Sequence, residues 1–136
     1  MSYLVVETKY PYPEPEYDRI ESRFINELYE QVKLVLAKIT DREVRGIISK
    51  EIDPEFGEPH IKITIYVDLD QEEYLSRYYD LRQRVSKILI ELYHKFVMMP
   101  MIFSETFFIT FDTPATIRRV LDDLLDRLLI DILPMR

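Results

Sequence analysis

The sequence predicts a single α+β domain over residues 1–136, a ferredoxin-like split β-α-β sandwich in the order βαββαβ, with an extra C-terminal helix. Three observations lead to this class. Apolar and polar residues alternate over 60–69, which is the period of a strand with one buried face. Apolar residues recur every three or four positions over 17–40 and over 71–97, which is the period of an amphipathic helix. A second strand-like segment precedes 60–69, so the two helices flank a hairpin.

The chain is predicted to begin with a short strand over 3–8. Pro11, Pro13 and Pro15 then favour extended backbone, so 10–16 is expected to be a connector.

The first helix is predicted over 17–40, and the strand after it over 44–52. The loop DPEFGEP follows, and its two prolines and one glycine mark a turn before the next strand begins at His60. The predicted apolar stripe of the helix consists of Ile20, Phe24, Leu28, Val32, Val35 and Ile39.

The junction between the strand at 60–69 and the second helix is the most strongly patterned part of the sequence. Asp70 is followed three positions later by Glu73, which is the spacing of a helix N-cap with a carboxylate in the first turn. Glu72 adds negative charge where the helix dipole favours it. The inward-facing side of the strand is predicted to consist of Ile61, Ile63, Ile65, Val67 and Leu69.

The second helix is predicted from about Gln71 to Val97, and a strand over 106–111 follows it. Thr113 and Pro114 then give an N-cap and a first helical residue, so the last helix is expected over 114–133. The predicted buried stripe of the second helix consists of Leu75, Tyr78, Leu81, Val85, Ile88, Leu89, Leu92 and Phe96.

The last helix has no place of its own in a ferredoxin-like sandwich, and its apolar surface is wide. Such a surface either covers the sheet or meets another subunit, and we expect a homodimer. The residues predicted at that interface are Leu121, Leu124, Leu125, Leu128, Leu129 and Ile132.

Composition excludes several classes of function. The chain contains no cysteine, which rules out disulfides, thiolate catalysis and iron–sulfur clusters. Its two glycines are too few for a phosphate-binding or dinucleotide-binding loop. No apolar run is long enough to span a bilayer, and no signal peptide is recognisable, so a cytoplasmic protein is expected. Few Asn and Gln, with many Ile, Val, Tyr and Glu, are typical of a thermophile.

A divalent metal site is one candidate for chemistry. Asp68 and Asp70 lie two residues apart at a strand end, and Asp112 ends the next predicted strand. Carboxylates in this arrangement can hold Mg²⁺ or Mn²⁺ for phosphoryl transfer. The competing interpretation is that Asp70 caps the helix and Asp68 lies on the wet face of the strand.

Nucleic-acid binding is a weaker candidate. The net charge of −7 argues against it, although arginines and tyrosines cluster on the second helix. Acidic residues interrupt that basic row, as expected for a solvated helix face with Tyr78 in the core.

The sequence therefore supports two hypotheses for function. The first is a non-enzymatic protein that needs no cofactor, self-associates, and binds a protein partner or a small ligand. The second is a metal-dependent phosphoryl-transfer or nuclease-like enzyme that uses the strand-end aspartates.

Overall fold

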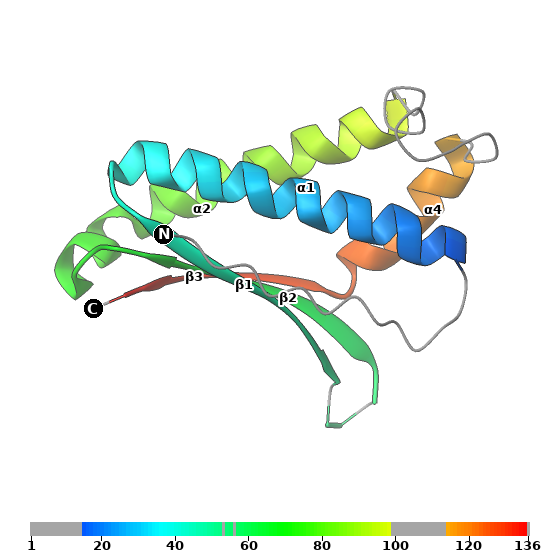
Figure 1. The fold of residues 1–136 in the computed structure, drawn as a ribbon, viewed down its shortest axis with the longest axis horizontal. Coiled ribbons are helices and arrows are strands. Elements are labelled where there is room, and N and C mark those ends of the chain that lie inside the picture. The colour runs from blue at the N-terminus through cyan, green and yellow to red at the C-terminus, as the bar shows by residue number, and fades with distance from the viewer. Residues whose placement is uncertain (1–14, 53, 56, 99–113, 136) are drawn as a thin grey trace.

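The computed structural model of the chain describes residues 15–52, 54–55, 57–98 and 114–135. In these ranges three helices and three strands follow one another in the order α-β-β-α-α-β (Figure 1). The elements are α1 (Pro15–Thr40), β1 (Val44–Ile52), β2 (Pro59–Val67), α2 (Gln71–Met98), α4 (Pro114–Leu125) and β3 (Leu128–Pro134).

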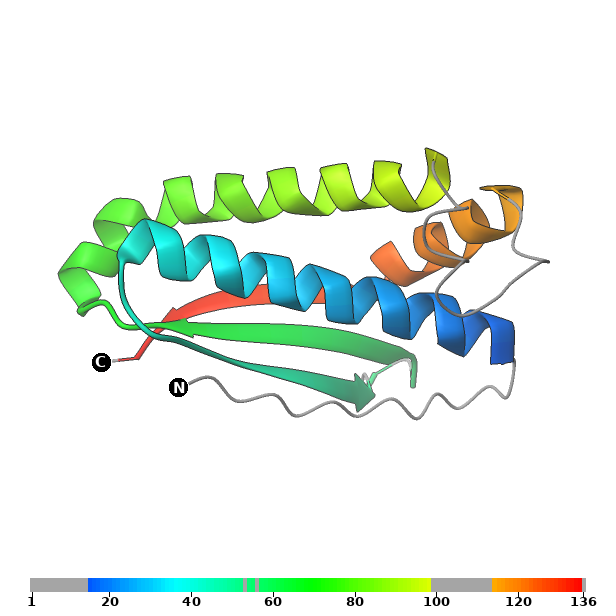
Figure 2. The same cartoon turned by 45° about the horizontal axis from the view of Figure 1, so that its top comes forward.

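The three strands form one sheet in the order β1-β2-β3. Strand β1 is antiparallel to β2, and β3 is parallel to β2. The three helices lie together on one face of this sheet, so the described chain has two layers (Figure 2). No described helix covers the opposite face.

The ferredoxin-like prediction is wrong. In a split β-α-β unit, another strand lies between the two parallel strands that a helix connects. Here β2 and β3 pair directly, from Ile61 with Leu128 to Val67 with Pro134, so no strand can lie between them. The strands predicted at 3–8 and 106–111 lie outside the described residues, as does Asp112.

The last helix is shorter than predicted. It ends at Leu125, and the segment from Leu128 is strand β3 instead of about two more helical turns. The sequence LLIDILP is apolar at nearly every position, so it satisfies a period of two as well as the helical period. This segment pairs with the edge of β2. The backbone hydrogen bonds between the two strands favour the strand conformation over the helix.

The predicted hairpin and the second helix are confirmed. Strand β1 has the predicted bounds, and α2 begins at Gln71 as expected. The backbone amide of Glu73 donates to Oδ1 of Asp70 at 2.8 Å, which is the N-cap bond that the sequence spacing predicted. Strand β2 ends at Val67, slightly before the predicted end.

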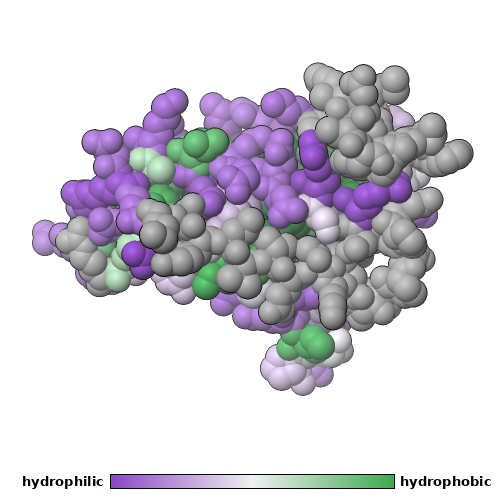
Figure 3. Space-filling model, viewed as in Figure 1, coloured by the Kyte–Doolittle hydropathy of each residue, from purple (hydrophilic) through white to green (hydrophobic). Residues whose placement is uncertain are grey.

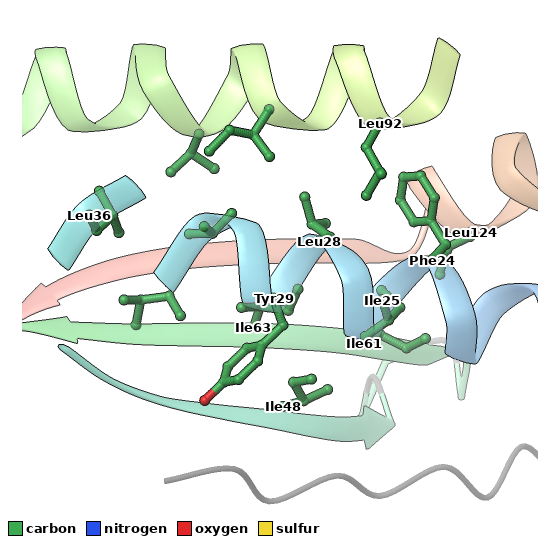
Figure 4. Close-up of a cluster of buried hydrophobic side chains, with 14 of the residues drawn as sticks. Phe24, Ile25, Leu28, Tyr29, Leu36, Ile48, Ile61, Ile63, Leu92 and Leu124 are labelled. Carbon is green, nitrogen blue, oxygen red and sulfur yellow. The ribbon is translucent and has the colours of Figure 1, made fainter. Parts of the chain in front are cut away.

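The core lies between the sheet and the helices (Figure 4). Phe24 of α1 and Phe96 of α2 make an edge-to-face contact at 5.1 Å between ring centroids. Members from the four neighbouring elements include Leu28, Tyr29 and Leu36 of α1, Ile63 and Ile65 of β2, Leu92 of α2 and Leu124 of α4.

The stripe predicted for α2 is wrong at its first turns. Leu75 and Tyr78 are exposed, with relative accessibilities of 63% and 41%, whereas Tyr74 is buried. Tyr74 lies about two helical turns before Leu81 and therefore on the same face of α2. Its hydroxyl donates to a backbone carbonyl of β3. A buried tyrosine needs such a partner, and only the tertiary structure supplies it.

Candidate functional site

The structure describes two of the three predicted metal ligands, Asp68 and Asp70, and both lie where β2 is joined to α2. Oδ1 of Asp70 accepts the N-cap hydrogen bond. The guanidinium of Arg42 donates to the backbone carbonyl of Asp68 at 2.9 Å and contacts Oε1 of Glu73 at 3.3 Å. A fixed cation therefore lies among these acidic groups. Within the described ranges, no group of three or more acidic or histidine side chains is placed to hold a metal ion.

The six predicted interface residues are divided between α4 and β3. Leu121, Leu124 and Ile132 are buried in the core of the chain itself. Leu125 and Leu128 are half-buried, and Leu129 is 48% exposed. The helix thus packs within its own chain, and Leu125, Leu128 and Leu129 are the members of the predicted set whose side chains stay accessible.

A buried ion pair joins α1 to the start of β3. Arg127 lies in the turn between α4 and β3, and its guanidinium donates to Glu21 of α1 and to Asp123. Glu21 is almost completely buried. Burial raises the pKa of the Glu21 carboxyl, against the opposing effect of the neighbouring Arg127 guanidinium. The pair fixes β3 against α1, and the sequence pattern had not singled it out because the partners lie 106 positions apart.

Several basic residues of α2 are used within the fold. Arg77 donates to the carbonyl of Ile39 at the C-terminal end of α1, at 3.0 Å. Arg84 makes an ion pair of 3.6 Å with Asp80 on the same helix. Arg77 therefore joins α2 to the end of α1, whereas Arg84 stays on the surface of its own helix. Tyr79, on the same helix, is 75% exposed.

Backbone hydrogen bonds at the two ends of β3 show which of its residues face β2. The amide of Ile61 donates to the carbonyl of Arg127 at 2.9 Å. The amide of Met135 donates to the carbonyl of Val67 at 2.8 Å. Backbone groups alternate in direction along a strand. The odd-numbered residues of β3 therefore bond to β2, and the even-numbered residues point to the outer edge of the sheet.

Three features close this outer edge of β3. Arg82 donates to the carbonyl of Ile130 at 2.5 Å. The hydroxyl of Tyr74 donates to the carbonyl of Ile132, also at 2.5 Å. Pro134 occupies the next outward position and has no N–H to offer. Side chains of α2 and a proline thus use the groups that another strand would need.

The opposite edge of the sheet is formed by β1. The same alternation makes the even-numbered residues of β2 face β1, so the odd-numbered residues of β1 bond to β2. The residues whose backbone groups point outward are Val44, Gly46, Ile48, Lys50 and Ile52. Among the described residues, no strand lies beside this edge. Arg82 and Tyr74 bond to outward carbonyls of β3. Within the described chain, no such bond reaches the outward backbone groups of Val44, Gly46, Ile48 and Ile52.

Strand β1 is nevertheless held firmly from the helix side. Gly46 lies under the ring of Tyr29, and a Cβ at this position would come within 2.5 Å of the Tyr29 hydroxyl oxygen. Figure 4 shows the Tyr29 ring pointing from α1 down to β1. Strand β1 is therefore an ordered strand of nine residues.

Apolar side chains are exposed near this edge and on the uncovered face of the sheet. Ile52 is 71% exposed, and Figure 3 shows apolar surface beside the end of the β1–β2 hairpin, below mainly hydrophilic helices. Ile47, Leu129 and Leu133 on the uncovered face are also exposed. A 3.5 Å ion pair between Lys62 and Asp131 lies on this face as well.

Comparisons with protein-family models, curated proteins and solved structures give no match to this chain. None of the described helices is both long enough and apolar enough to cross a membrane.

Proposed function

We propose that this chain is a non-enzymatic binding module that self-associates as a homodimer by pairing the outer edge of β1 with the same edge of a second copy. The observation that carries the proposal is the difference between the two edges of the sheet. Arg82, Tyr74 and Pro134 close the edge of β3, and the edge of β1 has no strand beside it in the described chain.

An open edge favours strand addition because its outward N–H and C=O groups are directed at a partner. Natural proteins commonly shorten such edges, cover them, or place charges and prolines on them. Strand β1 has nine residues and contains no proline, and its apolar end carries Ile52 in an exposed position. Pairing two such strands would give a continuous six-stranded sheet with all helices on one face.

The dimer is proposed to bind a protein partner or a small ligand. The joined sheet would present two copies of the exposed apolar residues Ile47, Leu129 and Leu133 on one uncovered face. The metal-dependent alternative gains no support, because the cap bond uses Asp70 and Arg42 is bound at Glu73.

The test is the oligomeric state of the full chain and of one edge variant, measured by sedimentation velocity at micromolar concentration. Ile52→Pro removes an outward N–H and keeps the bonds of β1 to β2 intact. We expect the unaltered chain to be a dimer and Ile52→Pro to shift towards monomer with an unchanged circular dichroism spectrum.

Ile52→Val is the matched control, because it keeps the N–H and an apolar side chain at the same position. It should remain a dimer. A monomeric unaltered chain, or a folded Ile52→Pro variant that dimerises as tightly as Ile52→Val, would overturn the proposal.

A further inference from the structure

We infer that the outer face of α2 binds the same face of a second copy, with the two helices antiparallel and the twofold axis beside Gln83. This contact goes beyond the pairing of β1 and does not depend on it. It uses a row of exposed residues, which we call the outer stripe and which consists of Leu75, Tyr79, Ser86 and Ile90.

The outer stripe is mainly apolar although it faces solvent. Leu75, Tyr79 and Ile90 are 63%, 75% and 59% exposed. The stripe residues are separated by 4, 7 and 4 positions, which are close to whole helical turns, so they lie on one face of α2. In Figure 2, α2 forms the upper boundary of the described elements. An exposed apolar surface of this kind is typical of an interaction site.

The spacing of the stripe is the same in both directions along the helix, and this symmetry indicates a second copy as the partner. A twofold contact places each residue opposite a residue of the same surface. With the axis beside Gln83, Leu75 of one copy faces Ile90 of the other. Tyr79 then faces Ser86, so a large side chain lies opposite a small one, as close packing of two helices requires.

Charge complementarity favours the antiparallel pairing. Glu72 and His94 are exposed at the two ends of the stripe, and this pairing brings Glu72 of one copy to His94 of the other, whose imidazole N–H can donate to the carboxylate. Lys87 follows Ser86, so its ammonium lies near the Tyr79 ring of the other copy, which is a favourable contact. In a parallel pairing each residue would face its own counterpart, and Glu72 would meet Glu72.

The contact is expected to be weak. Stable protein interfaces bury about 800 Å² on each partner, and a stripe of four residues presents less than this. The pairing of α2 should therefore appear at concentrations well above the micromolar range in which β1 pairing is tested.

Cysteine cross-linking tests the pairing, since the natural chain contains no cysteine. Gln83 is exposed beside the axis, so a short bifunctional maleimide should join two Gln83→Cys chains. Ser76→Cys is the matched control, because position 76 is exposed on the same helix but would lie about 20 Å from its counterpart in the antiparallel pair. It should give no cross-linked dimer, whereas a parallel pairing would cross-link it.

A charge within the stripe gives a second measurement. Ile90→Glu should raise the Kd of the contact about tenfold, because it places an unpaired carboxylate against Leu75 of the other copy. Leu34→Glu is the control: Leu34 lies on α1, outside the stripe, and is 69% exposed, so this variant should leave the Kd unchanged. Sedimentation velocity from micromolar to millimolar concentration measures both values.

The outcomes separate this contact from the pairing of β1. Absence of the Gln83→Cys cross-link, a cross-link that Ile90→Glu leaves intact, or a cross-link through Ser76→Cys would overturn the inference. None of these results bears on β1. Ile52→Pro should keep the Gln83→Cys cross-link, and its loss there would show that the contact of α2 depends on the pairing of β1, contrary to the inference.

Discussion

The two edges of the sheet differ in how they are held. At β3, side chains from other elements reach the strand. Tyr74 and Arg82 donate to its outer carbonyls, and Arg127, in the turn before β3, donates to Glu21. At β1, the strand is held by its ladder to β2 and by Tyr29 packed on Gly46. One edge has outer carbonyls bonded by described side chains, and beside the other edge the described residues place no strand.

Within the described residues, this difference teaches that an edge strand can be ordered without the side-chain bonds that close β3. Closure needs donors or a proline at the outward positions, and burial of the inward side chains does not supply either. Strand β3 is the last strand of the described chain and pairs only with β2. The side-chain bonds to β3 therefore also help to hold it in the sheet.

The largest effect is expected from breaking the ion pair that anchors β3. Arg127→Met leaves the buried Glu21 without its main cation, which should lower the free energy of unfolding by about 3–5 kcal/mol. Chemical denaturation monitored by circular dichroism measures this change. The double variant Glu21→Leu with Arg127→Met removes both charges and should recover most of the loss. A loss below about 1 kcal/mol in the single variant would show that the pair does not anchor β3.

Opening the edge of β3 should cost less stability and change the assembly. Tyr74→Phe leaves the carbonyl of Ile132 buried without its donor, at a cost of about 1–3 kcal/mol. Combined with Arg82→Met, it should make the β3 edge resemble the β1 edge. Light scattering should then detect species larger than a dimer. If the double variant keeps the size of the unaltered chain, the side chains hold β3 without protecting its edge.

The seat of β1 should tolerate little added volume. In Gly46→Ala, the new methyl group would meet the buried Tyr29 ring, and the resulting overpacking should cost about 1–3 kcal/mol. Thermal or urea denaturation measures the loss. Gly57→Ala changes a glycine with a φ of 70° in the hairpin loop but with no atom near its Cβ, so it separates backbone strain from the clash at Gly46. Equal stability of Gly46→Ala and the unaltered chain would contradict the packing of Tyr29 on β1.

The pH dependence of the anchor is a smaller effect. Burial raises the pKa of Glu21, so the folded state favours the protonated carboxyl more than the unfolded state does. The protonated Glu21 carboxyl stabilises the folded state below its ordinary pKa of 4.5. This contribution is lost as the pH rises through the raised pKa of the folded state. Glu21→Gln stays neutral, so its stability relative to the unaltered chain should improve between pH 4 and pH 7. Denaturation curves at these two values test the sign, and the opposite trend would show that the Arg127 guanidinium outweighs burial.

The smallest effect is expected from divalent cations. If Asp68 and Asp70 hold no metal, millimolar Mg²⁺ or Mn²⁺ should leave the Tm unchanged within about one degree, because a bound ligand stabilises the folded state. An increase that Asp68→Ala abolishes would restore the metal-dependent hypothesis.

Local patterns were sufficient to predict much of this fold. The bounds of β1, the start of α2 and the N-cap at Asp70 were all predictable, because alternation, amphipathic spacing and capping chemistry act over a few neighbouring residues. The candidate site was less accessible to such reasoning. Gly46 within a strand pattern signals close approach by another group, but nothing local identifies that group as Tyr29.

The tertiary structure decided what local patterns left open. LLIDILP fits both helix and strand periods, and its pairing with β2 made it a strand. Direct pairing of β2 with β3 also excluded the ferredoxin-like order. The sequence by itself determined which segments are amphipathic and where the helix caps lie. Only the folded chain decided how β3 is held and its edge closed, because Tyr74, Arg82 and Glu21 lie at least 48 positions from the groups they contact in β3 or in the turn before it.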